Sequence, residues 1–426
     1  MKKIALSLLI IVSYSLTAQD TLRIMQYNLL NYGNYTDYCT TSNNNIDDKD
    51  VFVRTIIDHV KPDIFSVNEI SSSEAIHQRL LDNDLNVNGI NYYRKANFLK
   101  VADSYLVNML YYNSQKLQLH SHTIAQSYIR DIDVYKLYYR SDDLAEGDTA
   151  FIICVVAHLK SSTGSTNESK RRDMVSNTMS YLDGYGENNN FMFMGDFNVY
   201  SSSEPAYQTL VNYTNPELNF YDPIDTPGDW NNNFTYRFVH TQSTHSDQNG
   251  CASYGGMDDR FDFILLSDNI MQGLKDVEYI EGSYTAVGQD GLHFNKSVNS
   301  APTNLSAPPN VIEALFGNSD HLPISIMLKI DKTLGVVNYE HSQFSEIEFI
   351  NPVSESLSLN IQAKTETYVN IKLMDIRGKI VLSDDRRVSV GQNRINYNVS
   401  ILNPGIYLGV FTDSNNGMII KKIVKK

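Results

Sequence analysis

Short apolar runs in this chain repeatedly begin or end at a carboxylate, amide or imidazole side chain. Runs of this length that are rich in Ile, Val, Phe and Met are typical of buried β-strands. The polar residues at their ends are Tyr27-Asn28, Asn68-Glu69, His158, Asp196-Phe197-Asn198, Arg260-Phe261-Asp262 and Ser319-Asp320-His321. Because strand ends are held by the scaffold while the loops beyond them stay open, the pattern indicates one site at a sheet edge.

The spacing of the remaining segments sets the fold class. Val51 to Val60 and Lys170 to Leu182 have helical spacing and lie between strand candidates. Strands that alternate with helices predict a sheet-centred α/β domain. From about residue 346 the sequence changes to short alternating runs separated by turn signals such as Asn403-Pro404-Gly405, which predicts a small all-β sandwich.

The charge of the chain is unevenly distributed. The 426 residues have a formal net charge of -14. Residues 19–345 hold 22 basic and 41 acidic residues, whereas residues 346–426 hold 11 basic and 8 acidic ones. This acidity excludes a protein that coats nucleic acid through bulk positive charge. It does not exclude an enzyme that meets phosphate through metal ions.

The first residues have the pattern of a targeting segment. Lys2 and Lys3 precede an apolar run from Ile4 to Val12, and small or polar residues follow up to Ala18. This pattern predicts a secretory signal peptide over residues 1–18. The apolar run is about half of the roughly 20 residues that a membrane span needs, so we expect no stable membrane span. The mature protein is expected to be secreted or held at the cell surface.

The chain has 3 cysteines, so at least one is unpaired. Cys154 lies in an apolar run and is expected to be an inert core thiol. Cys39 and Cys251 lie in polar loops and could pair with each other, which the sequence does not decide.

Taken together and in order, the polar strings resemble those of a known superfamily. Asn28, Glu69, His158, the Gly195-Asp196-Phe197-Asn198 string, Asp262 and the Ser319-Asp320-His321 string resemble the endonuclease/exonuclease/phosphatase superfamily, the DNase-I-like metal-dependent phosphoesterases. The match spans about residues 21–330. It implies a four-layer α/β/β/α sandwich, an α/β (α+β) fold in which two mixed sheets face each other and helices cover the outside.

The resemblance also implies a divalent cation, Mg²⁺ or alternatively Mn²⁺ or Ca²⁺, with Asn28, Glu69 and Asp320 as metal ligands. Such a hard cation prefers oxygen ligands and keeps waters for the phosphate. In the family, the residue at Asp196 activates or orients the attacking water. The residue at Asn198 holds a phosphate oxygen or that water.

Two histidines complete the predicted catalytic set. His321 would be the general base or a hydrogen-bond donor to phosphate, and Asp262 would orient it through its other ring nitrogen. His158 resembles the second histidine of the nuclease-like members, which contacts phosphate or protonates the leaving oxygen. Lys160 and Arg260 are predicted substrate contacts, for which a solvated loop lysine and a structural arginine are the alternatives.

The C-terminal segment resembles the sorting domain of type IX secretion. The resemblance rests on Asn351-Pro352, on the string from Met374 to Lys379, on the string from Leu402 to Tyr407, and on the basic end from Lys421 to Lys426. It implies that the type IX secretion machinery is a partner. An ordinary accessory β-module is the alternative.

We therefore expect four parts: a signal peptide (1–18), a catalytic domain (19–330), a linker (331–345) and a sorting domain (346–426). The expected activity is metal-dependent phosphoester hydrolysis by a secreted nuclease that acts on nucleic acid. The alternatives are a phosphomonoesterase, a sphingomyelinase-like lipid phosphodiesterase, and a non-catalytic binding module on the same fold. The choice between DNA and RNA and between endo- and exo- action stays open.

Overall fold

The computed structural model describes residues 20–144, 149–185, 189–332, 343–375, 379–414 and 418–426. The predicted signal peptide therefore lies outside the described residues. The chain divides into two compact units, Met1–Thr333 and Leu334–Lys426. The predicted linker at 331–345 falls at this division, and most of it also lies outside the described residues. Each unit is described by itself.

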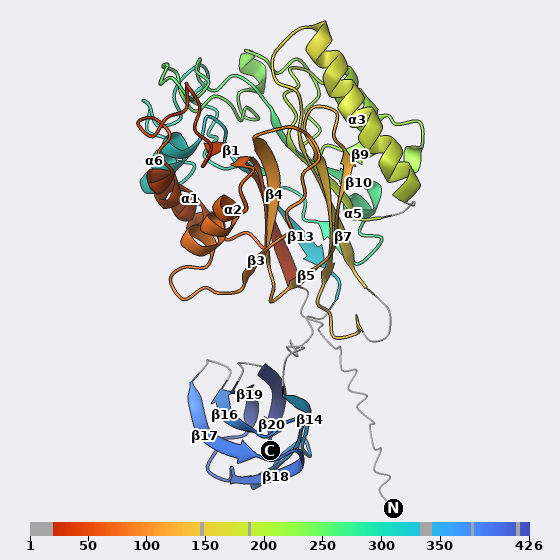
Figure 1. Ribbon diagram of the computed structural model, residues 1–426, viewed down its shortest axis with the longest axis vertical. Helices are drawn as coiled ribbons and strands as arrows, with labels where there is room; N and C mark the ends of the chain where they lie inside the picture. Colours follow the sequence, from red (N-terminus) through yellow and green to blue (C-terminus); the bar gives the residue numbers. More distant parts are fainter. Residues whose placement is uncertain (1–19, 145–148, 186–188, 333–342, 376–378, 415–417) are drawn as a thin grey trace, which may run out of the picture. The chain divides into compact units, whose positions relative to one another are not determined.

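Two sheets form the centre of the first unit (Figure 1). The first has the order β11-β13-β1-β2-β4-β3, with β12 also paired to β13, and the second has the order β5-β6-β7-β8-β10-β9. The strands of the first sheet are β1 (Asp20–Tyr32), β2 (Ile64–Ser71), β3 (Tyr93–Lys95), β4 (Leu106–Asn113), β11 (Val277–Tyr279), β12 (Thr285–Ala286) and β13 (Ile324–Ile330). Those of the second are β5 (Leu117–Gln126), β6 (Ile132–Tyr139), β7 (Phe151–His158), β8 (Phe191–Asp196), β9 (Phe220–Tyr221) and β10 (Asp262–Ser267).

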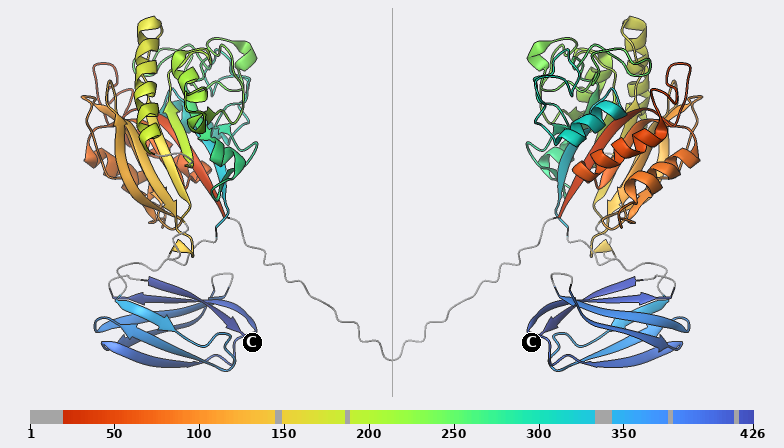
Figure 2. Two further views of the ribbon diagram at one scale, coloured as in Figure 1. Left: turned by 90° about the vertical axis from the view of Figure 1, so that its right-hand side faces the viewer. Right: turned by 90° about the vertical axis from the view of Figure 1, so that its left-hand side faces the viewer.

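Helices cover the outer face of each sheet (Figures 1 and 2). The first sheet carries α1 (Ile46–Val60), α2 (Glu74–Leu80) and α6 (Pro309–Asn318), and the second carries α3 (Ser165–Tyr185) and α4 (Pro205–Val211). Further helical segments of the described residues include α5 (Asp268–Gln272) and the single turns Leu81–Leu85, Pro216–Leu218 and Phe234–Tyr236.

Two buried clusters hold these layers together. One cluster joins Ile24 of β1 with Met194 of β8 and also includes residues of α1 and α6, so it fills the space between the sheets and under the first helical layer. The other packs Phe193 of β8 against Met174 and Leu182 of α3. Alternate residues of β8 therefore face opposite layers, as expected for a strand buried on both faces. The predicted α/β/β/α sandwich is confirmed.

The pairing of the strands explains why polar residues far apart in sequence share one edge. β1 and β2 run parallel, with Asn28 opposite Asn68, and β7 and β8 run parallel, with His158 opposite Asp196. β10 is antiparallel to β8 and begins where β8 ends, with Asp262 opposite Asp196. β13 is likewise antiparallel to β1, so the loop before it reaches the same edge.

The strand predictions for the first unit missed one hairpin. β5 and β6 form an antiparallel pair, but the sequence analysis placed no strand there. Most residues of β5 are only partly buried, so its apolar signal is weak. The helix predicted from Val51 begins earlier, at Ile46, because the Asn45 side chain accepts a hydrogen bond from the amide of Asp47 and caps it.

The second unit is a β-sandwich, as predicted. One sheet has the order β14-β15-β18 and the other the order β17-β16-β19-β20. The strands are β14 (Phe344–Glu348), β15 (Ser356–Ala363), β16 (Thr367–Asp375), β17 (Ile380–Val388), β18 (Gly391–Asn398), β19 (Gly405–Asp413) and β20 (Met418–Lys425). Leu359 of β15, Ile371 of β16 and Phe411 of β19 belong to the buried cluster between the sheets. Among the described residues, no helix is long and apolar enough to span a bilayer.

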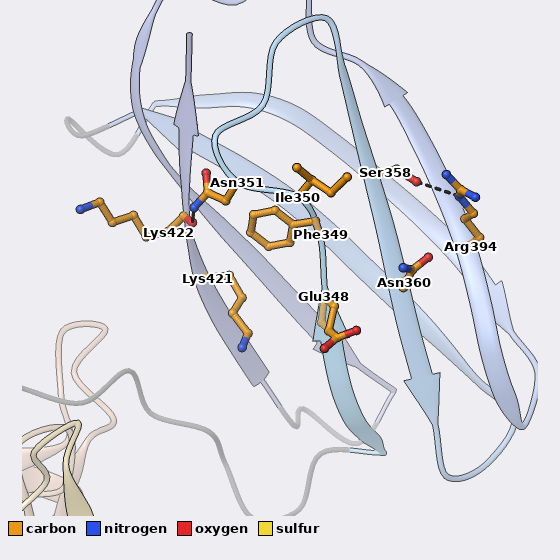
Figure 3. A pocket seen from close by; sticks show the side chains of 10 residues that line it. Glu348, Phe349, Ile350, Asn351, Ser358, Asn360, Arg394, Lys421 and Lys422 are labelled. Carbon is orange, nitrogen blue, oxygen red and sulfur yellow. Dashed lines mark hydrogen bonds between the residues drawn. The ribbon is translucent and has the colours of Figure 1, made fainter.

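A pocket of about 560 Å³ opens on this second unit (Figure 3). Its walls combine aromatic, aliphatic and charged side chains, including Phe349, Arg394 and Lys421. Arg394 Nε donates a hydrogen bond to Ser358 Oγ across the β15–β18 pair at 2.9 Å. Asn351 Nδ2 donates to the Lys422 carbonyl oxygen, which fixes the loop at the rim of the pocket.

Candidate active site

The backbone at the sheet edge departs from regular strand geometry where the polar residues sit. Glu69 and Asn198 have φ values of 57° and 51°, in the left-handed region. Such residues cost about 1–3 kcal/mol each and persist where the surrounding structure holds them. Gly195 has φ 143°, and a Cβ on it would lie 1.8 Å from the Ala157 carbonyl oxygen. Only glycine therefore lets β8 approach β7 closely enough to set Asp196 beside His158.

The most sharply defined contact of the site is a histidine–carboxylate pair. His321 Nδ1 lies 2.7 Å from Asp262 Oδ2, and both side chains are buried. Thr241 Oγ1 accepts hydrogen bonds from the amides of Phe261 and Asp262, which fixes the start of β10. The other ring nitrogen, His321 Nε2, lies 3.7 Å from Asp196 Oδ2. Burial disfavours the imidazolium, but Asp262, Asp196 and Asp320 together raise the pKa of His321 well above its ordinary value.

Asp196 lies at the centre of the site. Its Oδ1 accepts hydrogen bonds from the Asn198 amide at 3.0 Å and from Asn198 Nδ2 at 2.8 Å. Its Oδ2 accepts one from Asn28 Nδ2 at 3.0 Å. Burial raises the pKa of Asp196 to about 7, against the lowering effect of His321 and with further raising by Asp262 and Glu69.

Three side chains are close enough to share a cation. One ligand atom each from Glu69, His158 and Asp196 lies within 4.8 Å of the others. His158 Nε2 is 3.4 Å from Asp196 Oδ2 and 3.7 Å from Glu69 Oε1. Burial lowers the pKa of His158 well below its ordinary value, helped by Arg130, His321 and Lys160, and therefore favours the neutral ring. Two carboxylates and a neutral imidazole fit a divalent cation.

The predicted ligands Asn28 and Asp320 lie at the two sides of this group. Asn28 Nδ2 also donates to Glu69 Oε1 at 3.2 Å, while its Oδ1 accepts from the Leu30 amide. Asp320 Oδ2 accepts from Gln242 Nε2 and from the Ser253 amide, and its Oδ1 is buried with no hydrogen-bond partner among the described residues. Such an unpaired buried oxygen is what a cation or its water would satisfy.

Arg260 does not fit its predicted role as a substrate contact. Its side chain is 1% exposed, and Nη1 and Nη2 donate to both carboxylate oxygens of Asp222 at 2.7 and 2.9 Å. The guanidinium also lies 4.3 Å from the ring centroid of Phe263. The arginine is thus a buried structural group, the alternative that its sequence context left open.

Lys160 is partly buried in the loop after β7. Its Nζ donates to the Ser161 carbonyl oxygen at 2.7 Å. Burial and the nearby charges of Arg130, Lys170 and Arg171 lower the pKa of Lys160. Its role as a substrate contact stays a prediction.

Two residues that the sequence analysis did not single out face the same site. Arg130 donates from Nη1 to the Leu159 carbonyl oxygen at 2.7 Å; burial lowers the pKa of its guanidinium, and the charges of Glu69 and Asp196 oppose that shift. Gln242 Nε2 lies 2.7 Å from His321 Nε2. Both come from irregular loops rather than from strand ends, so no local pattern marks them.

A disulfide borders the site. Cys39 and Cys251 are bonded, with a Cα–Cα distance of 4.5 Å across 212 residues of sequence. Cys251 lies two residues before Ser253, whose amide holds Asp320. The structure therefore pairs the two loop cysteines whose pairing the sequence left undecided. Cys154 is a buried free thiol, as expected.

Comparison with known families matches the C-terminal part of the chain. Residues 349–426 match the family model described as a secretion system C-terminal sorting domain. This match confirms the sorting prediction and indicates secretion or cell-surface localisation. No curated protein matches the sequence at a significant level.

Solved structures similar to the chain include members of the superfamily that the sequence motifs indicated. An endonuclease/exonuclease/phosphatase family protein from Bacteroides thetaiotaomicron is 14% identical, with a TM-score of 0.45, and covers 74% of this chain and 97% of its own. A family member from Bacteroides vulgatus is 16% identical, with a TM-score of 0.44, over 73% of this chain and 99% of its own. The human Nocturnin catalytic domain with bound sulfate is 14% identical, with a TM-score of 0.45, over 74% and 97%.

The chain thus resembles endonuclease/exonuclease/phosphatase proteins and carries, at residues 349–426, a secretion system C-terminal sorting domain.

Proposed function

We propose that this protein is an exported, divalent-metal-dependent phosphodiesterase whose favoured substrate is nucleic acid. The observation that carries the proposal is the geometry around Asp196. Its Oδ2 lies 3.4 Å from His158 Nε2 and 3.7 Å from His321 Nε2, beside Glu69, in a buried group that both sheets contribute. Carboxylates, imidazoles and amides arranged in this way suit the hydrolysis of a phosphoester.

Each residue of the site has a role that its contacts support. Asp262 accepts from Nδ1 of His321 and so turns Nε2 toward the space beside Asp196, where it meets a phosphoryl oxygen or the attacking water. Asn198 holds one carboxylate oxygen of Asp196, which leaves the other to orient the water. His158, whose Nε2 lies 3.4 Å from the same Asp196 oxygen, is the proposed donor to the leaving oxygen.

Glu69 and Asp196 would hold the cation, with Asn28 and Asp320 as the other predicted ligands, and His158 keeps its Nε2 for the leaving oxygen. The cation, when bound, neutralises charge on the phosphate and lowers the pKa of the attacking water. The influence of Glu69 and Asp196 on Arg130 supports a role for its positive charge in stabilising the charge that develops in the transition state.

A lipid phosphodiester is the second candidate substrate, because an exposed apolar loop lies beside the site. The side chains of Val101 and Tyr105 are 69% and 77% exposed, and Tyr128, two residues from Arg130, is 55% exposed. The amides of Val101 and Ala102 donate to Asp131, which ties this loop to the one that carries Arg130. Exposed aromatic and aliphatic side chains serve equally to stack on bases or to enter a lipid surface.

The test is a substrate panel with the purified protein in Mg²⁺ and in EDTA. Plasmid DNA, single-stranded RNA, sphingomyelin vesicles, bis-p-nitrophenyl phosphate and p-nitrophenyl phosphate separate the substrate classes. We expect cleavage of nucleic acid and of the bis ester, and loss of both in EDTA. Cleavage that survives EDTA contradicts the metal dependence, and a protein that cleaves none of the panel is a binding module instead.

Export has its own test. The sorting domain implies handling by the type IX secretion machinery, and we propose that the tail is removed on export. Mass spectrometry of the culture medium is expected to find a mature protein that lacks the C-terminal unit. A secreted form with an intact Lys426 end contradicts removal.

A further inference from the structure

Lys49 is a buried lysine that the proposed mechanism does not use. It lies in the first turn of α1, and its side chain is 1% exposed. Nζ donates hydrogen bonds to the Leu30 carbonyl oxygen at 3.1 Å, to Asn44 Oδ1 at 3.0 Å, and to the Asn318 carbonyl oxygen. Three acceptors around one nitrogen require three N–H donors, so the geometry is that of the charged ammonium group.

The first of these contacts leads directly to the proposed metal site. The carbonyl of Leu30 belongs to the same peptide unit as the amide of Asn31. That amide donates to Glu69 Oε2 at 3.1 Å. This single peptide group therefore has the buried ammonium group of Lys49 at its oxygen and the carboxylate of Glu69 at its N–H. The positive and the negative charge both favour the same orientation of the peptide dipole.

The backbone conformation on both sides of this peptide is one that non-glycine residues rarely adopt. Leu30 and Asn31 have φ values of 47° and 53°, both in the left-handed region. Two consecutive non-glycine residues there cost about 1–3 kcal/mol each. The Lys49 and Glu69 contacts at the two ends of the peptide oppose its return to an ordinary conformation.

The third contact of Lys49 reaches the other side of the site. Asn318 ends α6, two residues before Asp320. The next residue, Ser319, donates from Oγ to the Asn28 carbonyl oxygen at 2.7 Å and accepts from the His321 amide at 3.1 Å. One ammonium group thus ties the end of β1 to the segment that carries Asp320 and His321.

We infer that Lys49 is a positioning residue for the cation site, which sets the carboxylate of Glu69 through the Leu30–Asn31 peptide. The inference rests on the proposed function, because it takes the Glu69 carboxylate as a metal ligand. An anchor for α1 could be made by any apolar side chain at lower cost, since burying an ammonium group carries a desolvation penalty. Burial lowers the pKa of Lys49 to about 7, and the charges of Asp320 and Glu69 oppose that shift.

The test measures cation binding in the absence of substrate. Lys49→Met keeps the length and apolar stem of the side chain but removes the charge and the donors. Lys329→Met is the matched control. Lys329 is partly exposed, pairs with Glu278, and lies near the end of β13 that is away from the site. Titration calorimetry with Mn²⁺ on the full-length protein gives the dissociation constant for each, and thermal unfolding gives the stability.

We expect Lys49→Met to weaken Mn²⁺ binding by about 10–100-fold, the usual effect of losing a group that orients a metal ligand. Lys329→Met is expected to bind like the wild type. If Lys49→Met does not fold, Lys49→Gln serves instead, because its amide can still donate two hydrogen bonds without the charge. The same weakening is expected in that variant.

Unchanged Mn²⁺ affinity in a folded Lys49 variant, with only a lower Tm, overturns the inference and leaves a structural role. A wild-type protein that binds no Mn²⁺ also overturns the inference. A wild-type protein that binds Mn²⁺ but hydrolyses no phosphoester overturns the proposed function alone, because the affinity difference between the variants can still be measured.

Discussion

Two buried histidine–aspartate pairs in the first unit have nearly the same nitrogen–oxygen distance and different surroundings. In the site, His321 Nδ1 lies 2.7 Å from Asp262. In the β5–β6 hairpin, His122 Nε2 lies 2.8 Å from Asp133. The second ring nitrogen of His122 contacts the Asn97 carbonyl oxygen at 2.7 Å, and its ring stacks on Tyr135.

The comparison shows what distinguishes a functional pair from a structural one. Both nitrogens of His122 are occupied by fixed groups of the fold. His321 instead presents Nε2 to the amides of Gln242 and Asn28 and to the carboxylate of Asp196, which belong to the candidate site. We therefore expect the proposed chemistry to depend on the second nitrogen rather than on the histidine–carboxylate contact.

The largest effect is expected from removing each histidine in turn. His321→Ala should lower the rate of phosphodiester hydrolysis by about 10²–10⁴-fold, because a proton-transfer or phosphate-binding group is lost. His122→Ala should keep the activity and lower the stability by about 1–3 kcal/mol, because it leaves the Asp133 carboxylate buried without this partner. Steady-state kinetics and thermal unfolding of both variants check this contrast. Equal loss of activity in the two histidine variants would contradict this contrast.

The contrast between a residue of the site and a structural residue also applies to two arginines. Arg260→Met removes one partner of a buried ion pair and should cost about 3–5 kcal/mol of stability, because it leaves the Asp222 carboxylate uncompensated. Arg130→Met should leave Tm nearly unchanged and raise the KM for a phosphodiester, because its charge faces Glu69 and Asp196. Denaturant unfolding and kinetics separate the two outcomes. A KM effect in a stably folded Arg260 variant would restore the substrate contact first predicted for it.

These arginines show how far the sequence could predict the site. His158 and Asp196 end β7 and β8, whereas Asn28 and Glu69 lie a few residues before the ends of β1 and β2, so a local apolar pattern places all four near one edge once the strands are recognised. The Arg260-Phe261-Asp262 string has the same form whether its arginine faces substrate or core, and only the position of Asp222 decides between the two.

Other parts of the site depend on contacts between distant segments, for which a single sequence has no signal. Arg130, Gln242 and Lys49 come from two loops and a helix, and they meet the site only through the packing of both sheets. The fold was more predictable, because burial on both faces of the central strands gives continuous apolar runs. Strand β5 lacks that signal because most of its residues are only partly buried, whereas β6 is mostly buried and is nonetheless not predicted from its sequence.

A smaller effect is expected at a carboxylate far from the site, which tests whether unpaired buried oxygens mark function. Asp84 Oδ1 is buried without a hydrogen-bond partner among the described residues, as Asp320 Oδ1 is. Burial and the charge of Asp50 raise the pKa of Asp84 to about 8, against the lowering effect of the Tyr32 hydroxyl. The folded state therefore holds this proton more tightly than the unfolded state, whose pKa is about 4.

The stability that the protonated Asp84 contributes is present below about pH 4 and is lost as the pH rises toward 8. Asp84→Asn, which imitates the protonated form, should flatten the pH dependence of the unfolding free energy across this range without changing activity. Asp82→Asn, at an exposed neighbour, is the control. Urea unfolding at several pH values gives the comparison, and a slope that Asp84→Asn leaves intact would assign the titration to another group.

The central claim is that the buried group around Asp196 hydrolyses phosphodiesters with a bound cation. The most direct measurement is the rate of bis-p-nitrophenyl phosphate hydrolysis as a function of Mg²⁺ concentration, for the wild type and for Glu69→Gln. We predict saturable activation of the wild type by Mg²⁺, and a variant that needs far more Mg²⁺ and stays orders of magnitude slower. Equal rates in the two proteins, or a wild-type rate that does not depend on Mg²⁺, would contradict the claim.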